Sequence, residues 1–157
     1  MSKNDVTIRI ANRQYRESLE PKGEAFTREL TLEDEFEIMT EGTVYTKQNA
    51  TYISYDESEK SGLENRHTVI KVTDDAMNIR RFGKGSSRDM DLHLEPGMIA
   101  ITRYRMPMGS MDLEVYTSKL ERDLDESGYG KIFAEYSIRM QDVVRLRNQL
   151  EIRIQPD

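Results

Sequence analysis

The sequence has no cysteine and no tryptophan among its 157 residues. A chain without cysteine forms no disulfide, offers no thiolate nucleophile and holds no cysteine-ligated zinc, and this composition is typical of a reducing compartment. It also has no apolar run long enough to cross a bilayer, and its first residues, MSKNDVTIRI, lack the apolar core of a signal peptide. We therefore expect a cytoplasmic protein with no membrane segment.

Positive charges are fewer than negative ones, 23 Lys and Arg against 29 Asp and Glu, and the formal net charge is -6. Such a chain repels phosphate backbones and anionic lipid unless it carries a strong local basic patch. Arginines gather only near the C-terminus, where acidic residues interrupt them and no aromatic platform accompanies them: Arg139, Arg145, Arg147 and Arg153. We interpret this group as a solvated strand face and predict neither a nucleic-acid nor a membrane partner.

Familiar catalytic and cofactor motifs are absent as well. The sequence has no G-x-S-x-G nucleophile elbow, no P-loop and no dinucleotide-binding glycine pattern, and its two histidines, His67 and His93, are isolated. We predict no catalytic residue, no metal site and no cofactor. The question of enzymatic activity stays open, with binding favoured over catalysis.

What the sequence does contain is alternation of apolar and polar residues with a period of two, the pattern of half-buried β-strands. The alternation is clearest where Met90, Leu92 and Leu94 have polar neighbours. It predicts strands within residues 6–10, 35–39, 52–56, 68–73, 77–81, 89–94, 99–106, 111–116, 132–140 and 146–154. Turn residues at 74–75, 95–97 and 107–109 predict short connections, which favour antiparallel neighbours.

Helical periodicity is almost missing from the chain. Leu120 and Leu124, spaced i, i+4, predict one short helical segment near 119–126. With no long helix to shield a sheet, the strands must cover one another. We therefore predict an all-β fold, an antiparallel up-and-down barrel of about 8–10 strands forming one domain over residues 1–157. A two-sheet sandwich is the alternative, and the acid-rich stretch 16–33 is interpreted as a hairpin tip or a long loop.

Several segments carry a family resemblance through their order and spacing. They are GTVYTKQNATYISYDES (residues 42–58), HTVIKV (67–72), RRFG (80–83), RYRMPMG (103–109), LEVYTSKLERDLDESGYGKI (113–132) and AEYSI (134–138). Together they resemble the YwiB-like family of uncharacterised bacterial proteins from about Phe36 onward. The stretch between Gln14 and Glu33 departs from the family. The resemblance implies a calycin-like barrel, related to lipocalin and fatty-acid-binding folds, with no established activity and no functional residues to transfer.

Candidate site residues are the polar residues that share a strand face with apolar ones, because small barrels either fill their interior or leave room for one ligand. On this criterion the candidate ligand-binding residues are Glu57, Arg81, Thr117, Tyr136 and Asn148. If Glu57 and Arg81 point inward, desolvation requires that they pair with each other or with a charged group of a ligand. The alternative is a filled core, with both residues at strand ends in contact with water.

Three functions remain open on the sequence alone. The favoured one is a non-enzymatic barrel that binds a small, partly apolar molecule. A filled barrel acting as a protein-interaction or oligomerisation module is the first alternative, and an enzyme with an acid/base pair in its cavity is the second. The alternation of apolar and polar residues does not distinguish these functions, because the same alternation builds hollow and filled barrels. It also leaves the oligomeric state and the face occupied by Tyr104 undetermined.

Overall fold

The computed structural model describes residues 4–57, 66–83, 88–106, 109–140 and 144–157. These residues form ten β-strands: β1 (Asn4–Lys22), β2 (Ala25–Lys47), β3 (Ala50–Asp56), β4 (His67–Val72), β5 (Met77–Phe82), β6 (Arg88–Leu94), β7 (Ile99–Met106), β8 (Gly109–Leu124), β9 (Gly130–Met140) and β10 (Val144–Pro156). The prediction of an all-β fold is confirmed. The part of the chain that the structure describes contains no helix, and so none that could span a membrane.

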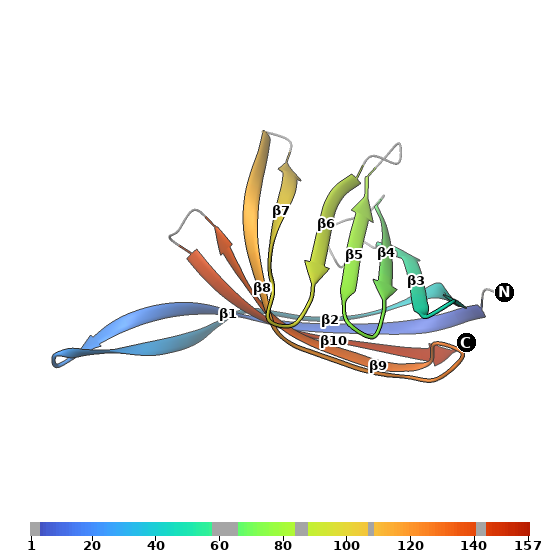
Figure 1. Ribbon diagram of the computed structural model, residues 1–157, viewed down its shortest axis with the longest axis horizontal. Coiled ribbons are helices and arrows are strands. Elements are labelled where there is room, and N and C mark those ends of the chain that lie inside the picture. Colours follow the sequence, from blue (N-terminus) through green and yellow to red (C-terminus); the bar gives the residue numbers. More distant parts are fainter. Residues whose placement is uncertain (1–3, 58–65, 84–87, 107–108, 141–143) are drawn as a thin grey trace.

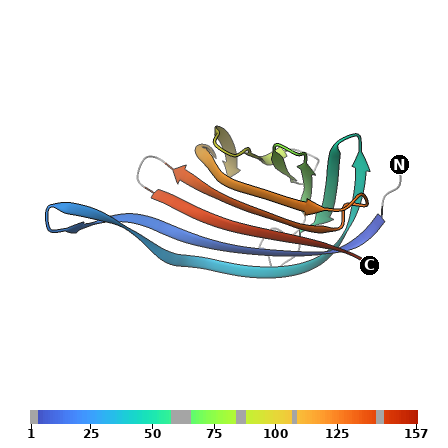
Figure 2. The same ribbon diagram turned by 60° about the horizontal axis from the view of Figure 1, so that its bottom comes forward.

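The strands form one antiparallel sheet with the order β6-β5-β4-β3-β2-β1-β10-β9-β8-β7. Each strand neighbours the next one in sequence except β6, because β6 and β7 form the two edges of the sheet. In addition, β1 pairs with β10, which places Ile8 opposite Ile154. This is the connectivity of an up-and-down barrel cut between β6 and β7. Figures 1 and 2 show the sheet curving so that β3 to β6 lie over the long strands β1, β2 and β8 to β10.

The sheet is not closed by backbone pairing at its two edges. Among the described residues, β6 and β7 share no ladder of backbone hydrogen bonds. Instead, the Thr102 hydroxyl of β7 donates to the Asp91 carbonyl of β6 at 3.0 Å. The turn between these strands also bonds to β8, because the Gly97 N–H donates to the Thr117 carbonyl at 2.9 Å. A side-chain hydrogen bond and the turn between β6 and β7 therefore connect the two edges of the sheet.

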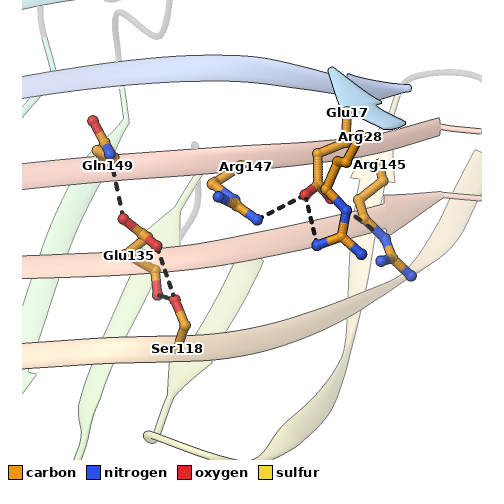
Figure 3. Close-up of polar contacts among 7 residues, drawn as sticks. All are labelled: Glu17, Arg28, Ser118, Glu135, Arg145, Arg147 and Gln149. Carbon is orange, nitrogen blue, oxygen red and sulfur yellow. Dashed lines mark hydrogen bonds and ion pairs between the residues drawn. The ribbon is translucent and has the colours of Figure 1, made fainter. Parts of the chain in front are cut away.

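The alternation in the sequence separates the two faces of the sheet. Inward side chains from β1 to β6 and from β8 to β10 form one apolar core, whose fully buried members include Ile8, Ile53, Ile70, Leu94 and Ile132. The outward face of β8, β9 and β10 is polar. There Ser118 and Gln149 both donate to Glu135, with Ser118 reaching both its carbonyl and its carboxylate (Figure 3).

The predicted helical segment near 119–126 is wrong, because β8 continues to Leu124 and a turn follows. A β-bulge lies between Thr117 and Lys119. Before the bulge the odd-numbered residues of β8 face inward, and after it Leu120 and Leu124 pack against the core. An extra residue in one strand reverses the parity of every later side chain, which moves the inward face of β8 from odd to even positions. Leu120 and Leu124 are four residues apart, so they share a face of a strand as readily as a face of a helix.

The stretch 16–33, interpreted above as a hairpin tip or a long loop, is mostly strand. Only Gly23 and Glu24 lie in the turn between β1 and β2. The pairing of β1 with β10 ends at Glu17, so beyond it β1 and β2 continue as a two-stranded ribbon. Figures 1 and 2 show this ribbon extending well past the other strands. We call the ribbon, together with the residues at its base that still pair with β10, the arm (residues 14–34).

The structure confirms two of the three predicted turns, and part of the third lies outside the described residues. The connection at 74–75 is confirmed, since β4 and β5 pair directly across residues 73–76. The turn at 95–97 is confirmed as well, and Gly97 has a positive φ of 79° there. Residues 107–108 of the third predicted turn lie outside the described residues, and so does the side chain of Tyr104.

Candidate functional site

The interior of the sheet contains a cavity of about 470 Å³. This volume lies within the roughly 300–1,000 Å³ typical of small-molecule sites. Its walls are mainly aliphatic and include Ile10, Ile38, Ile70, Ile79, Leu92, Leu150 and Ile152. Asp34 and Phe36 of β2 also line it and are exposed, which places the mouth of the cavity beside the base of the arm.

One row of residues crosses β3 to β6, and all of its members except Thr68 line the cavity. Strand register sets Tyr55 opposite Thr68, Thr68 opposite Arg81, and Arg81 opposite Met90. Glu57 follows directly after β3 and stays close to this row because its N–H donates to the Arg66 carbonyl at 2.8 Å. The row therefore brings a buried carboxylate, two hydroxyl groups and a guanidinium group together.

Within this row the Glu57 carboxylate is well supplied with donors. The Thr68 hydroxyl donates to Glu57 Oε1 at 2.6 Å, and Arg81 Nε lies 3.8 Å from the same oxygen. Burial raises the pKa of the Tyr55 hydroxyl, and the Glu57 carboxylate, to which that hydroxyl donates, raises it further, whereas Arg81 opposes the rise. Tyr55 therefore stays protonated at neutral pH and acts as a donor.

Arg81 is less well satisfied than Glu57. Its Nε is buried without a hydrogen-bond partner, and its Nη1 contacts only the soft sulfur of Met90, at 3.8 Å. A buried charged donor without an acceptor is costly, so this guanidinium favours any acceptor that enters the cavity.

A second row lies on β1, β10, β9 and β8. Register sets Gln14 opposite Asn148, Asn148 opposite Tyr136, and Tyr136 opposite Thr117. Burial raises the pKa of Tyr136 to about 12, and the charge of Arg81 opposes part of that rise. Arg81 and Tyr136 line the same cavity, so the two rows face each other across the interior.

The amides of the second row are only partly satisfied. Asn12 and Gln14 both donate to Asn148 Oδ1, at 3.3 and 3.1 Å. The Nδ2 of Asn148 and the Oδ1 of Asn12 are buried and have no hydrogen-bond partner. One unused donor and one unused acceptor therefore lie on two amides that already contact each other.

Four of the five sequence-predicted site residues line this cavity, namely Glu57, Arg81, Tyr136 and Asn148. Thr117 is buried at the end of the second row but is not part of the lining, and its backbone holds the turn between β6 and β7. Asn12, Gln14 and Thr68 were not among the candidate site residues predicted from the sequence. Asn12 and Gln14 follow Ile8 and Ile10 at the same two-residue spacing, so the signal was present. Ligand binding by any of these residues stays a prediction.

Comparison with known proteins identifies the family. Residues 23–152 match a family described as "Domain of unknown function (DUF1934)". The chain belongs to the DUF1934 family. The chain is similar to the "Uncharacterized beta-barrel protein YwiB" of Bacillus subtilis (strain 168). The two are 31% identical over 106 residues, which cover 68% of this chain and 70% of that protein. The resemblance to YwiB-like proteins is thereby confirmed.

A solved structure supports the fold of this DUF1934 member. The crystal structure of ywiB protein from Bacillus subtilis aligns with a TM-score of 0.64 and 21% sequence identity, covering 96% of this chain and 92% of that one. At this identity the likeness concerns the fold alone. The DUF1934 family description and the YwiB name assign no activity, so function must be argued from the cavity.

Proposed function

We propose that this DUF1934 protein is a non-enzymatic binding protein of the calycin type, whose interior cavity holds one small, partly apolar molecule. The observation that carries the proposal is the combination of aliphatic walls with buried polar atoms that lack partners, on Arg81, Asn148 and Asn12. Native proteins satisfy nearly all buried polar groups, and ligand sites are a recognised exception. The proposal includes the cytoplasm as the compartment, since a cysteine-free chain suits reducing conditions.

A thermal-shift screen of metabolite and lipid libraries tests this proposal. A ligand present at 100 times its Kd stabilises the folded state by about 2.7 kcal/mol, which is readily measured. Leu150→Phe places a larger side chain in the cavity wall, and we expect it to abolish the ligand-induced shift. Ile101→Phe enlarges an exposed side chain on β7 and serves as the matched control. Hits that stabilise wild type and Leu150→Phe equally would contradict binding in the cavity.

The arm supports a second candidate function, association of two copies of this chain. Its two strands are amphipathic. Register places Leu19 beside Arg28, Pro21 beside Phe26, and Leu32 beside Tyr15 on one face. Leu19 and Phe26 are 67% and 69% exposed there, and no residue that the structure describes covers them. Contiguous apolar surface of this kind typically marks an interface.

The charges on the arm favour an antiparallel arrangement of two arms. At the base, the single carboxylate of Glu17 contacts Arg28, Arg145 and Arg147, which leaves positive charge in excess (Figure 3). Near the tip, Glu20, Lys22 and Glu24 are exposed and carry a net negative charge. A two-fold axis through the arm would place the acidic tip of each copy over the basic base of the other, as isologous dimers require.

Light scattering during size-exclusion chromatography tests this second function. We expect wild type to show a concentration-dependent dimer and the double variant Leu19→Ser, Phe26→Ser to remain monomeric. Ile101→Ser, an equally exposed apolar residue on β7, is the control and should dimerise as wild type does. A wild type that is monomeric at every concentration would rule out self-association.

A further inference from the structure

The charges that face the cavity bear on the chemistry of its ligand, an inference that rests on the binding function proposed above. Glu57 and Arg81 are the oppositely charged pair of the interior, and their side chains are 3% and 19% exposed. Asp34 adds a negative charge only at the exposed mouth. The interior end of the cavity is therefore already electrically balanced.

This balance penalises a ligand of either charge. A carboxylate that approached Arg81 would also approach Glu57, whose Oε1 lies 3.8 Å from Arg81 Nε. An ammonium group that approached Glu57 would in turn meet Arg81. In an interior of low dielectric constant a third charge has no counter-ion, so its desolvation is not compensated. An uncharged polar group avoids this penalty.

The hydrogen-bonding atoms define what that uncharged group should carry. Arg81 Nε and Asn148 Nδ2 are buried donors without acceptors, and Asn12 Oδ1 is a buried acceptor without a donor. Asn148 and Asn12 are in direct contact, because Asn12 Nδ2 donates to Asn148 Oδ1. The protonated hydroxyl of Tyr136 lies beside Asn148 in the sheet register and adds a further donor. A matching group must accept from Asn148 and donate to Asn12 at adjacent atoms.

We propose that the cavity selects an uncharged molecule whose polar end carries an adjacent hydrogen-bond acceptor and donor, as a carboxamide does, and that it discriminates against carboxylates of the same size and shape. The carbonyl of such a group accepts from Asn148, with Arg81 as a further donor, and its N–H donates to Asn12. The apolar remainder of the molecule lies against the aliphatic wall formed by residues such as Ile10, Ile79 and Leu150.

Three probes with the same apolar chain test this selectivity by isothermal titration calorimetry at pH 7: octanamide, octanoate and octylammonium. We expect octanamide to bind wild type at least about tenfold more tightly than either ion, a difference of roughly 1.4 kcal/mol. A wild type that binds octanoate or octylammonium as tightly as octanamide would overturn this inference and leave the binding function standing. Binding of none of the three would overturn it as well, and the library screen would then decide the binding function separately.

The variant Glu57→Gln sharpens the test, because it removes the negative charge and leaves Arg81 without a counter-ion. We expect its preference to reverse, so that octanoate binds at least about tenfold more tightly than octanamide. Glu37→Gln makes the same chemical change at an exposed outward position and should keep the wild-type order. Circular dichroism confirms that both variants fold, and if Glu57→Gln does not, the wild-type ranking alone decides. A folded Glu57→Gln that still prefers octanamide contradicts the role of charge balance.

Discussion

Arg81 Nε lies 3.8 Å from Glu57 Oε1 in the interior, near enough for strong Coulomb attraction but too far for a hydrogen bond. The carboxylate has other donors, since the hydroxyls of Thr68 and Tyr55 both reach it. The guanidinium lacks an acceptor at Nε. The pair is therefore asymmetric, with a satisfied anion and a cation that still has bonding capacity.

This asymmetry predicts unequal effects on stability. Arg81→Met should lower the free energy of unfolding by about 1–3 kcal/mol, because a carboxylate only 3% exposed loses its counter-ion. Glu57→Gln should cost less, since Arg81 is partly exposed and its charge is reached by solvent. Urea denaturation of both variants measures the difference. A Glu57→Gln protein less stable than Arg81→Met would contradict this description of the pair.

Alkaline pH should destabilise the protein through Tyr136. Its pKa is raised from the ordinary 10.0 to about 12, so the folded state retains a proton that the unfolded chain loses. The stabilisation from this group is complete below pH 10 and is lost as the pH rises through 12, because stability falls wherever the folded state binds more protons. Tyr136→Phe should lose stability less steeply than wild type between pH 9 and about 11.5 in denaturation experiments. Parallel curves for the two proteins would refute the assignment.

The bulge in β8 predicts which residues face the core after Thr117. Leu120 packs against the core after the bulge, whereas Glu121 is exposed. Leu120→Ala should cost about 1–3 kcal/mol, less than at a fully buried position. Glu121→Ala, the matched neighbour, should change stability by under about 0.5 kcal/mol. Equal effects at the two positions would show that the alternation does not continue past Thr117.

Glu17 should be the most sensitive charged residue of the arm. Its side chain is 6% exposed, and its carboxylate lies 2.7, 3.6 and 3.8 Å from Arg147, Arg28 and Arg145 (Figure 3). Glu17→Gln leaves three arginines that repel one another, so we expect a loss of about 1–3 kcal/mol that shrinks as salt is added. Glu33→Gln removes the carboxylate of a more exposed pair and should cost about 1 kcal/mol or less. A salt-independent loss in Glu17→Gln would argue against repulsion.

The two-residue alternation of apolar and polar side chains was sufficient to predict much of the fold and part of the cavity. A two-residue period placed Glu57 after Tyr55, and Arg81 after Ile79, on the inward face, since strand geometry leaves no other choice while the period holds. It failed where the period breaks. The bulge in β8 moves the inward face from odd to even positions, and the four-residue spacing of Leu120 and Leu124 that follows it fits a strand face as well as a helix face.

Other features were not predictable from local pattern for different reasons. The acidic composition and Pro21 led to the interpretation of residues 16–33 as a hairpin tip or a long loop, although an exposed two-stranded ribbon tolerates both. The open seam between β6 and β7 depends on long-range curvature of the sheet. The contact of Asn12 and Gln14 with Asn148 depends on the pairing of the first strand with the last, which joins residues more than 130 positions apart. No window along the sequence contains that information.

The most direct test of the central claim is to locate a bound ligand by methyl NMR. In protein labelled at isoleucine methyl groups, titration with a hit from the library screen should shift the signals of cavity-lining Ile10 and Ile79. The signals of Ile99 and Ile101, which are exposed on β7, should stay in place. Shifts confined to the exposed isoleucines, with the cavity signals unmoved at saturation, would contradict the claim that this protein binds its ligand inside the curved sheet.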